Sequence, residues 1–191
     1  MESRFQRVEL ENGLKLFIEQ TNDDTIAIAI GVKIGSIFER SDIRGISHLL
    51  EHMMFKSNRK YDYREISSIF ELLGGDFNAF SARDKTVYYA EVLKGNFPKV
   101  VDVLYHMFIN DRYREDEFNK EKSVVLSEIR STKSDPESWI WTLGPLSLYG
   151  KSDLGDPIMG YEETLANIGK AELEEFKARS VSYTHLTLPT N

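Results

Sequence analysis

The spacing of apolar residues changes abruptly in the first third of this sequence. From Ile26 to Ile34 every second residue is β-branched, a period of two that is typical of a strand with one apolar face. Between residues 44 and 56 the apolar residues instead recur three and four positions apart, which is the period of a helix. The chain therefore joins a strand to a helix, and its fold must bury an apolar face of each.

Further strands and helices are expected on both sides of this change. Asn12-Gly13 favours a tight hairpin turn, and it lies between two strand-like segments, Phe5–Leu10 and Leu14–Glu19. Two more strands are expected at 76–81 and 86–92, and helices at 63–73, 97–109, 115–132, 136–148 and 170–179. The stretch 144–160, rich in Gly, Pro and Asp, predicts a long surface loop. This order indicates an α+β fold, with helices packed on a largely antiparallel β-sheet.

Length and composition exclude several classes of protein. A chain of 191 residues is about one domain long, and it contains no apolar run of the ~18–20 residues that a membrane-spanning helix needs. Its net charge is −7 and Lys and Arg are not clustered, so we expect no nucleic-acid partner. The first residues lack the apolar segment of a secretory signal, and we expect a cytoplasmic protein. Because cysteine is absent, a metal site would have to use His, Asp and Glu.

The last eleven residues differ from those before them. Residues 181–191 contain no Asp, Glu, Lys or Arg, whereas Ala171–Arg179 is dense in charge. This string resembles the translation of a common sequencing-library adapter. We interpret it as a non-native tail, and we expect the natural gene to continue past about Ser180. The alternative is a genuine C-terminal strand, because Thr, Leu and Tyr suit one.

Two of the four histidines lie in the helical segment, in the order His48-Leu-Leu-Glu51-His52. At 100° per residue His52 lies about 40° round the helix from His48, so both imidazoles can reach one zinc ion at about 2.0–2.1 Å. Glu51 projects close to them, where it can reach a water on that ion. This H-x-x-E-H order is that of a reversed zinc-peptidase motif.

The alternative is that both histidines are merely exposed polar positions of an ordinary helix. Their neighbours are apolar on several sides, which predicts a largely buried helix, and two unpaired buried imidazoles would be costly. A catalytic zinc needs a third protein ligand. The chain has no cysteine, and His106 is the other candidate histidine before residue 181, so a carboxylate is favoured as the third ligand. Composition alone does not decide which of the nineteen glutamates supplies it.

The motif and its surroundings resemble the pitrilysin/insulinase family of zinc metallopeptidases. His48–Lys56 resembles the zinc-binding helix of that family, and Leu10–Leu14 resembles its opening hairpin. Gly74–Ala79 with Thr86–Tyr88 resembles its central strands, and Glu121–Ile129 its second glutamate-bearing helix. The resemblance covers about residues 5–179.

This resemblance implies a role for two glutamates far from the histidines. Glu128, 76 positions after His52, corresponds to the third zinc ligand. Glu121 lies two helical turns earlier on the same face, and it corresponds to an acidic residue that aids catalysis or orients the site. Both positions could instead be solvated charges of an ordinary helix.

The resemblance also implies where a peptide substrate binds. Asn78, Ala79 and Phe80 correspond to an edge strand on which the peptide lies as an added strand. Main-chain hydrogen bonds of that kind require no particular side chain, so broad peptide selectivity would follow. The alternative is an ordinary strand of the sheet.

The function implied is that of a zinc-dependent metalloendopeptidase with one Zn²⁺ per domain and Glu51 as its general base. Residues 1–180 would form the N-terminal catalytic domain, one half of a clamshell that a second homologous domain or subunit completes around a peptide. We therefore expect the isolated chain to bind zinc but to hydrolyse peptides poorly. Two alternatives are a non-catalytic scaffold subunit of the same fold and a zinc hydrolase that does not act on peptides.

Overall fold

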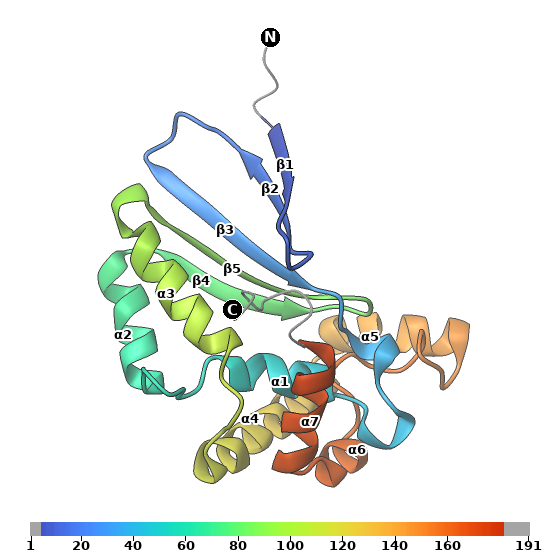
Figure 1. Cartoon of the computed structure of the whole chain (residues 1–191). Helices are drawn as coiled ribbons and strands as arrows, with labels where there is room; N and C mark the ends of the chain where they lie inside the picture. The colour runs from blue at the N-terminus through green and yellow to red at the C-terminus, as the bar shows by residue number, and fades with distance from the viewer. Residues whose placement is uncertain (1–4, 182–191) are drawn as a thin grey trace.

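The computed structural model describes residues 5–181 and is mixed α and β, as expected (Figure 1). Its strands are β1 (Phe5–Glu9), β2 (Lys15–Glu19), β3 (Thr25–Val32), β4 (Asp76–Ser81) and β5 (Thr86–Leu93). Its helices are α1 (Ile46–Met54), α2 (Tyr63–Leu73), α3 (Phe97–Phe108), α4 (Glu115–Ser134), α5 (Pro136–Tyr149), α6 (Glu162–Asn167) and α7 (Lys170–Ser180), with short 3-10 turns at Ser36–Phe38, Ser41–Ile43 and Lys94–Asn96. Among residues 5–181, no helix combines the length and the hydropathy that crossing a membrane requires.

The strands form two antiparallel sheets. β3, β5 and β4 pair in that order, with Ile28 opposite Ala90 and Ala79 opposite Tyr88. β1 and β2 form a separate hairpin around Gly13, whose φ is +82°, as the Asn-Gly pair predicts. Figure 1 shows this hairpin standing away from the three-stranded sheet. The expected antiparallel arrangement is therefore confirmed, and β4 forms one edge of the larger sheet.

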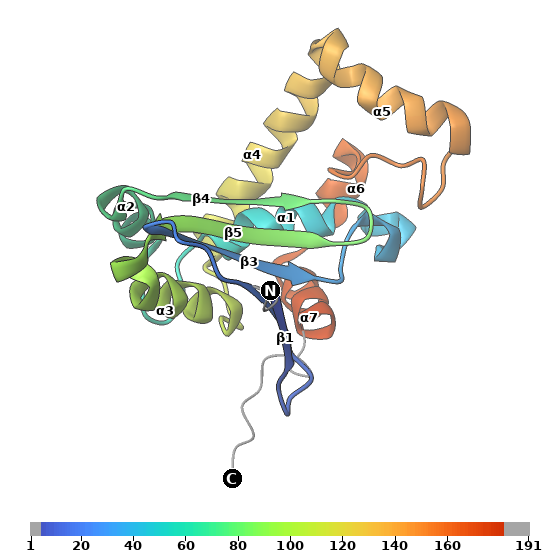
Figure 2. The same ribbon diagram turned by 90° about the horizontal axis from the view of Figure 1, so that it is seen from above.

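Helix α1 forms the centre of the core. Figures 1 and 2 show it on the face of the three-stranded sheet that the helices cover, and it contacts β4, α4 and α7. Its apolar residues are at most 2% exposed: Ile46, Leu49, Leu50, Met53 and Met54. At 100° per residue these side chains lie within one arc of about 140°, so α1 is anchored along one face and its two histidines are held on a helix with little freedom to move.

The beginning of α1 is fixed by the segment that precedes it and by the segment that follows α5. The Glu39 carboxylate accepts hydrogen bonds from the backbone N–H groups of Gly45 and Ser47, each at 2.8 Å, and so satisfies donors that a helix N-terminus leaves unpaired. The buried Arg44 donates to the carbonyl groups of Ser36 and Glu39, and its Nε lies 3.2 Å from Asp156. The segment that follows α5 is thereby joined to the start of α1.

Gly45 is required at this junction. Its φ is +97°, and a Cβ added there would lie 2.4 Å from the carbonyl oxygen of Met159. Gly160 faces it with φ +72°, and a Cβ there would lie 2.1 Å from the carbonyl oxygen of Arg44. The two backbones are therefore in direct contact, and α1 begins at Ile46 rather than at residue 44, because Gly45 is left-handed.

Replacing Gly45 by alanine is expected to destabilise the protein by about 2–4 kcal/mol. The left-handed backbone costs an L-residue about 1–2 kcal/mol, and displacing the Met159 backbone adds about as much. Urea unfolding followed by far-UV circular dichroism measures the effect. The matched control is Gly31→Ala in β3, where an added Cβ meets nothing within 4 Å. Equal unfolding midpoints for the two variants would contradict the packing described here.

The helix expected at 136–148 is confirmed as α5, and the expected loop at 144–160, which overlapped it, is wrong in its first residues. Residues 144–149 are not loop, because α5 continues to Tyr149 and ends at Gly150, whose φ is +62°. Pro145 removes one helical N–H, but the next turn still closes, with the Gly150 N–H donating to the Leu146 carbonyl at 2.9 Å. α6 was not expected, because six residues are too few to show a helical period. Of the stretch interpreted as a non-native tail, residues 182–191 lie outside the described residues.

Helix α5 extends away from the rest of the domain (Figure 2). Among the described residues, none of those in α5 is buried, and Trp141 on it is 82% exposed. Trp139 is partly buried near α4 and residues 157–161. Like the β1–β2 hairpin, α5 adds little to the core.

Candidate metal centre

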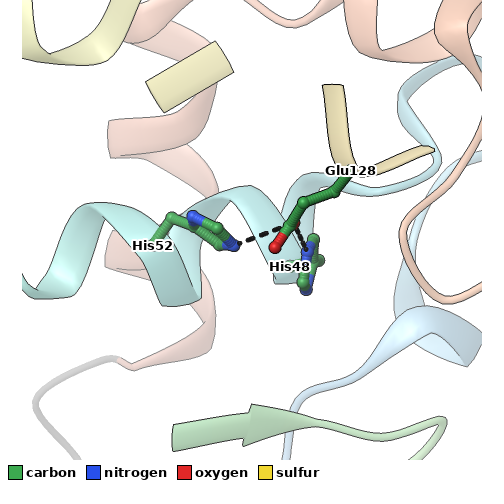
Figure 3. A group of neighbouring side chains, drawn as sticks. All are labelled: His48, His52 and Glu128. Carbon is green, nitrogen blue, oxygen red and sulfur yellow. Dashed lines mark hydrogen bonds and ion pairs between the residues drawn. The ribbon is translucent and has the colours of Figure 1, made fainter. Parts of the chain in front are cut away.

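Three side chains from two helices converge on one point (Figure 3). His48 and His52 lie one turn apart on α1, and Glu128 reaches them from α4, which packs across α1. Glu128 Oε2 is 3.1 Å from His48 Nε2 and 3.3 Å from His52 Nε2. The fold therefore brings together the two histidines of the motif and the glutamate that the family resemblance implied, although 76 positions separate Glu128 from His52.

The geometry of this group fits a zinc ion. Ligand atoms about 2.0–2.1 Å from a tetrahedral zinc lie about 3.3–3.4 Å from one another. The two measured distances to Glu128 Oε2 are within a few tenths of an ångström of that spacing, and one ligand atom from each residue lies within 4.8 Å of the others. Two imidazoles and one carboxylate are a common protein ligand set for catalytic zinc.

His48 is protonated at neutral pH when no metal is bound. Burial alone would lower its pKa, but hydrogen bonds and charges from Glu128 and Glu51 outweigh burial and raise the pKa to about 9. The hydrogen bond with His48 in turn lowers the pKa of Glu128. The group is thus an ion pair in the free protein, and a metal that binds His48 must displace its proton.

Glu121 lies behind His52. Its Oε2 is 3.4 Å from Nδ1 of His52, the ring nitrogen that does not face Glu128, and its Oε1 is 2.8 Å from Lys56 Nζ. Burial would raise its pKa, but the contacts with His52 and Lys56 outweigh burial and lower it. A carboxylate on Nδ1 favours the tautomer with its proton there, which leaves Nε2 free to bind a metal. Glu121 is therefore placed to orient His52.

Glu51 is held between α1 and the sheet. It is 9% exposed, and its Oε2 accepts a hydrogen bond from Ser81 Oγ at 2.5 Å and lies 3.6 Å from His48 Nδ1. Burial would raise its pKa, but the hydrogen bonds with His48 and Ser81 outweigh burial and lower it. The carboxylate is thus ionised at neutral pH, as a proton acceptor must be.

Ser81 is a contact that sequence reasoning missed. Along β4 exposed and partly buried residues alternate, so Ser81 shares the less exposed face with Phe77 and Ala79. That alternation could have marked it as facing the helices, but it could not have shown which helical residue it meets.

The three residues expected to bind substrate lie on β4. Within residues 5–181 no strand pairs with the outer edge of β4, so this edge is open to a further strand. The Ala79 N–H donates to Asn78 Oδ1 at 2.9 Å, a bond local to the strand, and Phe80 is 46% exposed. His106, the other candidate ligand, lies instead on α3, with Nε2 3.6 Å from Asp102.

Known proteins resemble this chain in sequence and in fold. A chain from Bacillus subtilis named as an uncharacterized zinc protease is 40% identical over 174 residues, which is 90% of this chain and 42% of that one. A protease from Helicobacter pylori has a similar fold, with a TM-score of 0.88 at 24% identity, over 94% of this chain and 44% of that one. An M16 domain from Pseudomonas fluorescens that is described as inactive also has a similar fold, with a TM-score of 0.81 at 19% sequence identity. The similarity covers 91% of this chain and 43% of that one.

The chain thus spans about two fifths of the length of the curated relatives it matches. The family model described as insulinase (peptidase family M16) matches residues 15–161, more than half of the chain. That match includes both histidines of α1 and Glu128. This chain belongs to the insulinase family, peptidase family M16.

Proposed function

We propose that this chain is the zinc-binding domain of a metalloendopeptidase. The observation that carries the proposal is the convergence of His48, His52 and Glu128 at zinc-ligand spacing, with the ionised Glu51 beside His48. Membership of a peptidase family, and a relative named as a zinc protease, support the same reaction class.

In this proposal His48, His52 and Glu128 hold one Zn²⁺. When bound, zinc supplies Lewis-acid chemistry, because it polarises a peptide carbonyl and lowers the pKa of water. Glu51 takes a proton from the attacking water and later gives it to the leaving amine nitrogen. Glu121 keeps the His52 ring oriented, and Lys56 holds Glu121 in place.

The proposed substrate is an extended peptide added to the open edge of β4, along Asn78, Ala79 and Phe80. An added strand needs edge N–H groups as donors. The Ala79 N–H is bonded to the Asn78 side chain, so a peptide that uses this donor must first displace that side chain. Hydrogen bonds of this kind involve the main chain, and they suit peptides of varied sequence.

We further propose that residues 1–180 act with a second domain or subunit. The chain spans about two fifths of its curated relatives, so the remaining three fifths could close over the β4 edge. The isolated chain is then expected to bind zinc but to hydrolyse peptides poorly. A casein-type digest by the full-length gene product, with and without a chelator, tests the peptidase proposal and separates it from a zinc hydrolase that ignores peptides.

A scaffold role without catalysis is the second candidate. It is favoured by one observation, the similarity of the fold to an M16 domain described as inactive. The two candidates differ in metal content. A scaffold has no need of stoichiometric zinc, whereas the proposed peptidase binds one ion per domain.

Zinc binding at pH 7 is expected to release about one proton per ion, from His48. An imidazole must lose its extra proton before it can bind a metal, and His48, whose pKa is raised to about 9, carries that proton below this pH. The apparent affinity should therefore rise with pH up to about 9 and level off above it. Calorimetric titration of the chain in two buffers of different ionisation enthalpy counts the protons. Binding of one zinc without proton release would refute the ion pair described for the free site, and no binding would favour the scaffold.

A further inference from the structure

We infer that Ser81 is a positioning residue for the proposed base, through the hydrogen bond from its hydroxyl to Oε2 of Glu51. This inference rests on the proposed function. It concerns the hydroxyl at the end of β4, a residue distinct from the proposed metal ligands and from the three residues proposed to bind substrate.

The contact is short and connects two elements. The distance between Ser81 Oγ and Glu51 Oε2 is 2.5 Å, in the range of a strong hydrogen bond to a carboxylate. The other contact of Glu51 described above is with His48, on the same helix, at 3.6 Å. The Ser81 bond is thus the one that fixes the rotation of the Glu51 carboxylate relative to the sheet. It engages Oε2, the oxygen that also lies 3.6 Å from His48 Nδ1.

Ser81 is itself held on a rigid part of the fold. It pairs with Thr86 of β5, and the Thr86 hydroxyl donates to the Ile34 carbonyl at 3.0 Å. The turn between β4 and β5 is closed by the Ala82 N–H, which donates to the Lys85 carbonyl at 2.8 Å. A Cβ on Gly35 would lie 2.4 Å from the Ala82 carbonyl oxygen, so this turn also packs closely on the preceding segment. A donor supported in this way can hold its partner in one orientation.

The position of Ser81 gives this bond a second consequence. Ser81 directly follows Phe80, at the end of the strand on which the peptide is proposed to lie. Strand β4 would therefore position both the peptide, through its open edge, and the proposed base, through Ser81. Loss of the hydroxyl should misorient the base without weakening peptide binding.

The test is Ser81→Ala in the full-length gene product, assayed by peptide hydrolysis. We expect kcat to fall about 10–100-fold, the usual effect of removing an outer hydrogen-bond partner in a metal site, with KM within about twofold. Zinc content and the thermal midpoint should be retained. Ser81→Thr keeps a hydroxyl and suits a strand, so it should restore kcat to within about threefold. The matched control is Ser67→Ala on α2, where the exposed hydroxyl donates to the Tyr63 carbonyl of its own helix.

The outcomes separate this inference from the proposed function. Unchanged kcat in Ser81→Ala, beside a wild type whose turnover requires zinc, would overturn the positioning role alone. A fall in kcat accompanied by loss of zinc or of the fold, without recovery in Ser81→Thr, would also overturn it, because that pattern indicates a structural role. Absence of zinc-dependent turnover in the wild type would overturn the proposed function and the role of Ser81 with it.

Discussion

Replacing Glu51 by glutamine is expected to lower peptide turnover by about 10²–10⁴-fold while zinc content stays at one ion per domain. The amide has almost the same shape as the carboxylate and can still accept from Ser81, but it cannot take a proton from water. Because His48, His52 and Glu128 are unchanged, the metal should remain. Peptide hydrolysis by the full-length gene product measures the first effect, and metal analysis of the same sample measures the second.

The control for this variant is Glu71→Gln, which makes the same chemical change on an exposed position of α2. It should leave turnover and zinc content unaltered. If Glu51→Gln hydrolysed peptides as fast as the wild type, the assignment of Glu51 as the base would be wrong. If it lost zinc, Glu51 would have a role in binding the metal that the proposal does not give it.

Replacing His52 by alanine is expected to abolish stoichiometric zinc binding and, with it, peptide hydrolysis. The imidazole contacts Glu128 through one nitrogen and Glu121 through the other. Its removal leaves two of the three proposed ligands, and it leaves Glu121 without an imidazole to orient. Since loss of an outer partner alone costs about 10–100-fold in metal affinity, loss of a direct ligand should cost more. A competition titration with a chromophoric chelator gives the affinity.

His106→Ala is the matched control, since it removes an imidazole from α3, where the ring lies beside Asp102. This variant should bind zinc as the wild type does. Equal zinc affinity for His52→Ala and the wild type would refute the proposed ligand set, whereas loss of zinc in both variants would indicate a general effect on folding.

Local periodicity was enough to predict the helix that carries His48 and His52. Two residues four apart on a helix share a face whatever the rest of the chain does, and the apolar neighbours of this pair showed that the helix is buried. The alternation of residues along the strands and the Asn12-Gly13 turn can likewise be recognised from neighbouring residues alone. These features explain why most elements were predicted within a few residues of their observed bounds.

Contacts between distant segments could not be predicted in that way. Glu128 is a charged position on a charged helix, and only the crossing of α4 over α1 brings it to the histidines, so it was identified through the family resemblance. Ser81 and Glu39 depend similarly on how β4 and residues 36–43 pack on α1. The loop expected from residue 144 was wrong at its start because it was predicted from the Gly, Pro and Asp content of 144–160, whereas the helix expected at 136–148 continues through Pro145 and loses only a limited number of hydrogen bonds there.

The exposed helix α5 determines what fluorescence can report about this protein. Both tryptophans of the chain, Trp139 and Trp141, lie on that helix. Intrinsic tryptophan emission will therefore monitor the surroundings of α5, including the part of α4 that Trp139 faces. A blue shift on adding a second polypeptide would indicate that α5 becomes covered, because Trp141 is 82% exposed in this chain.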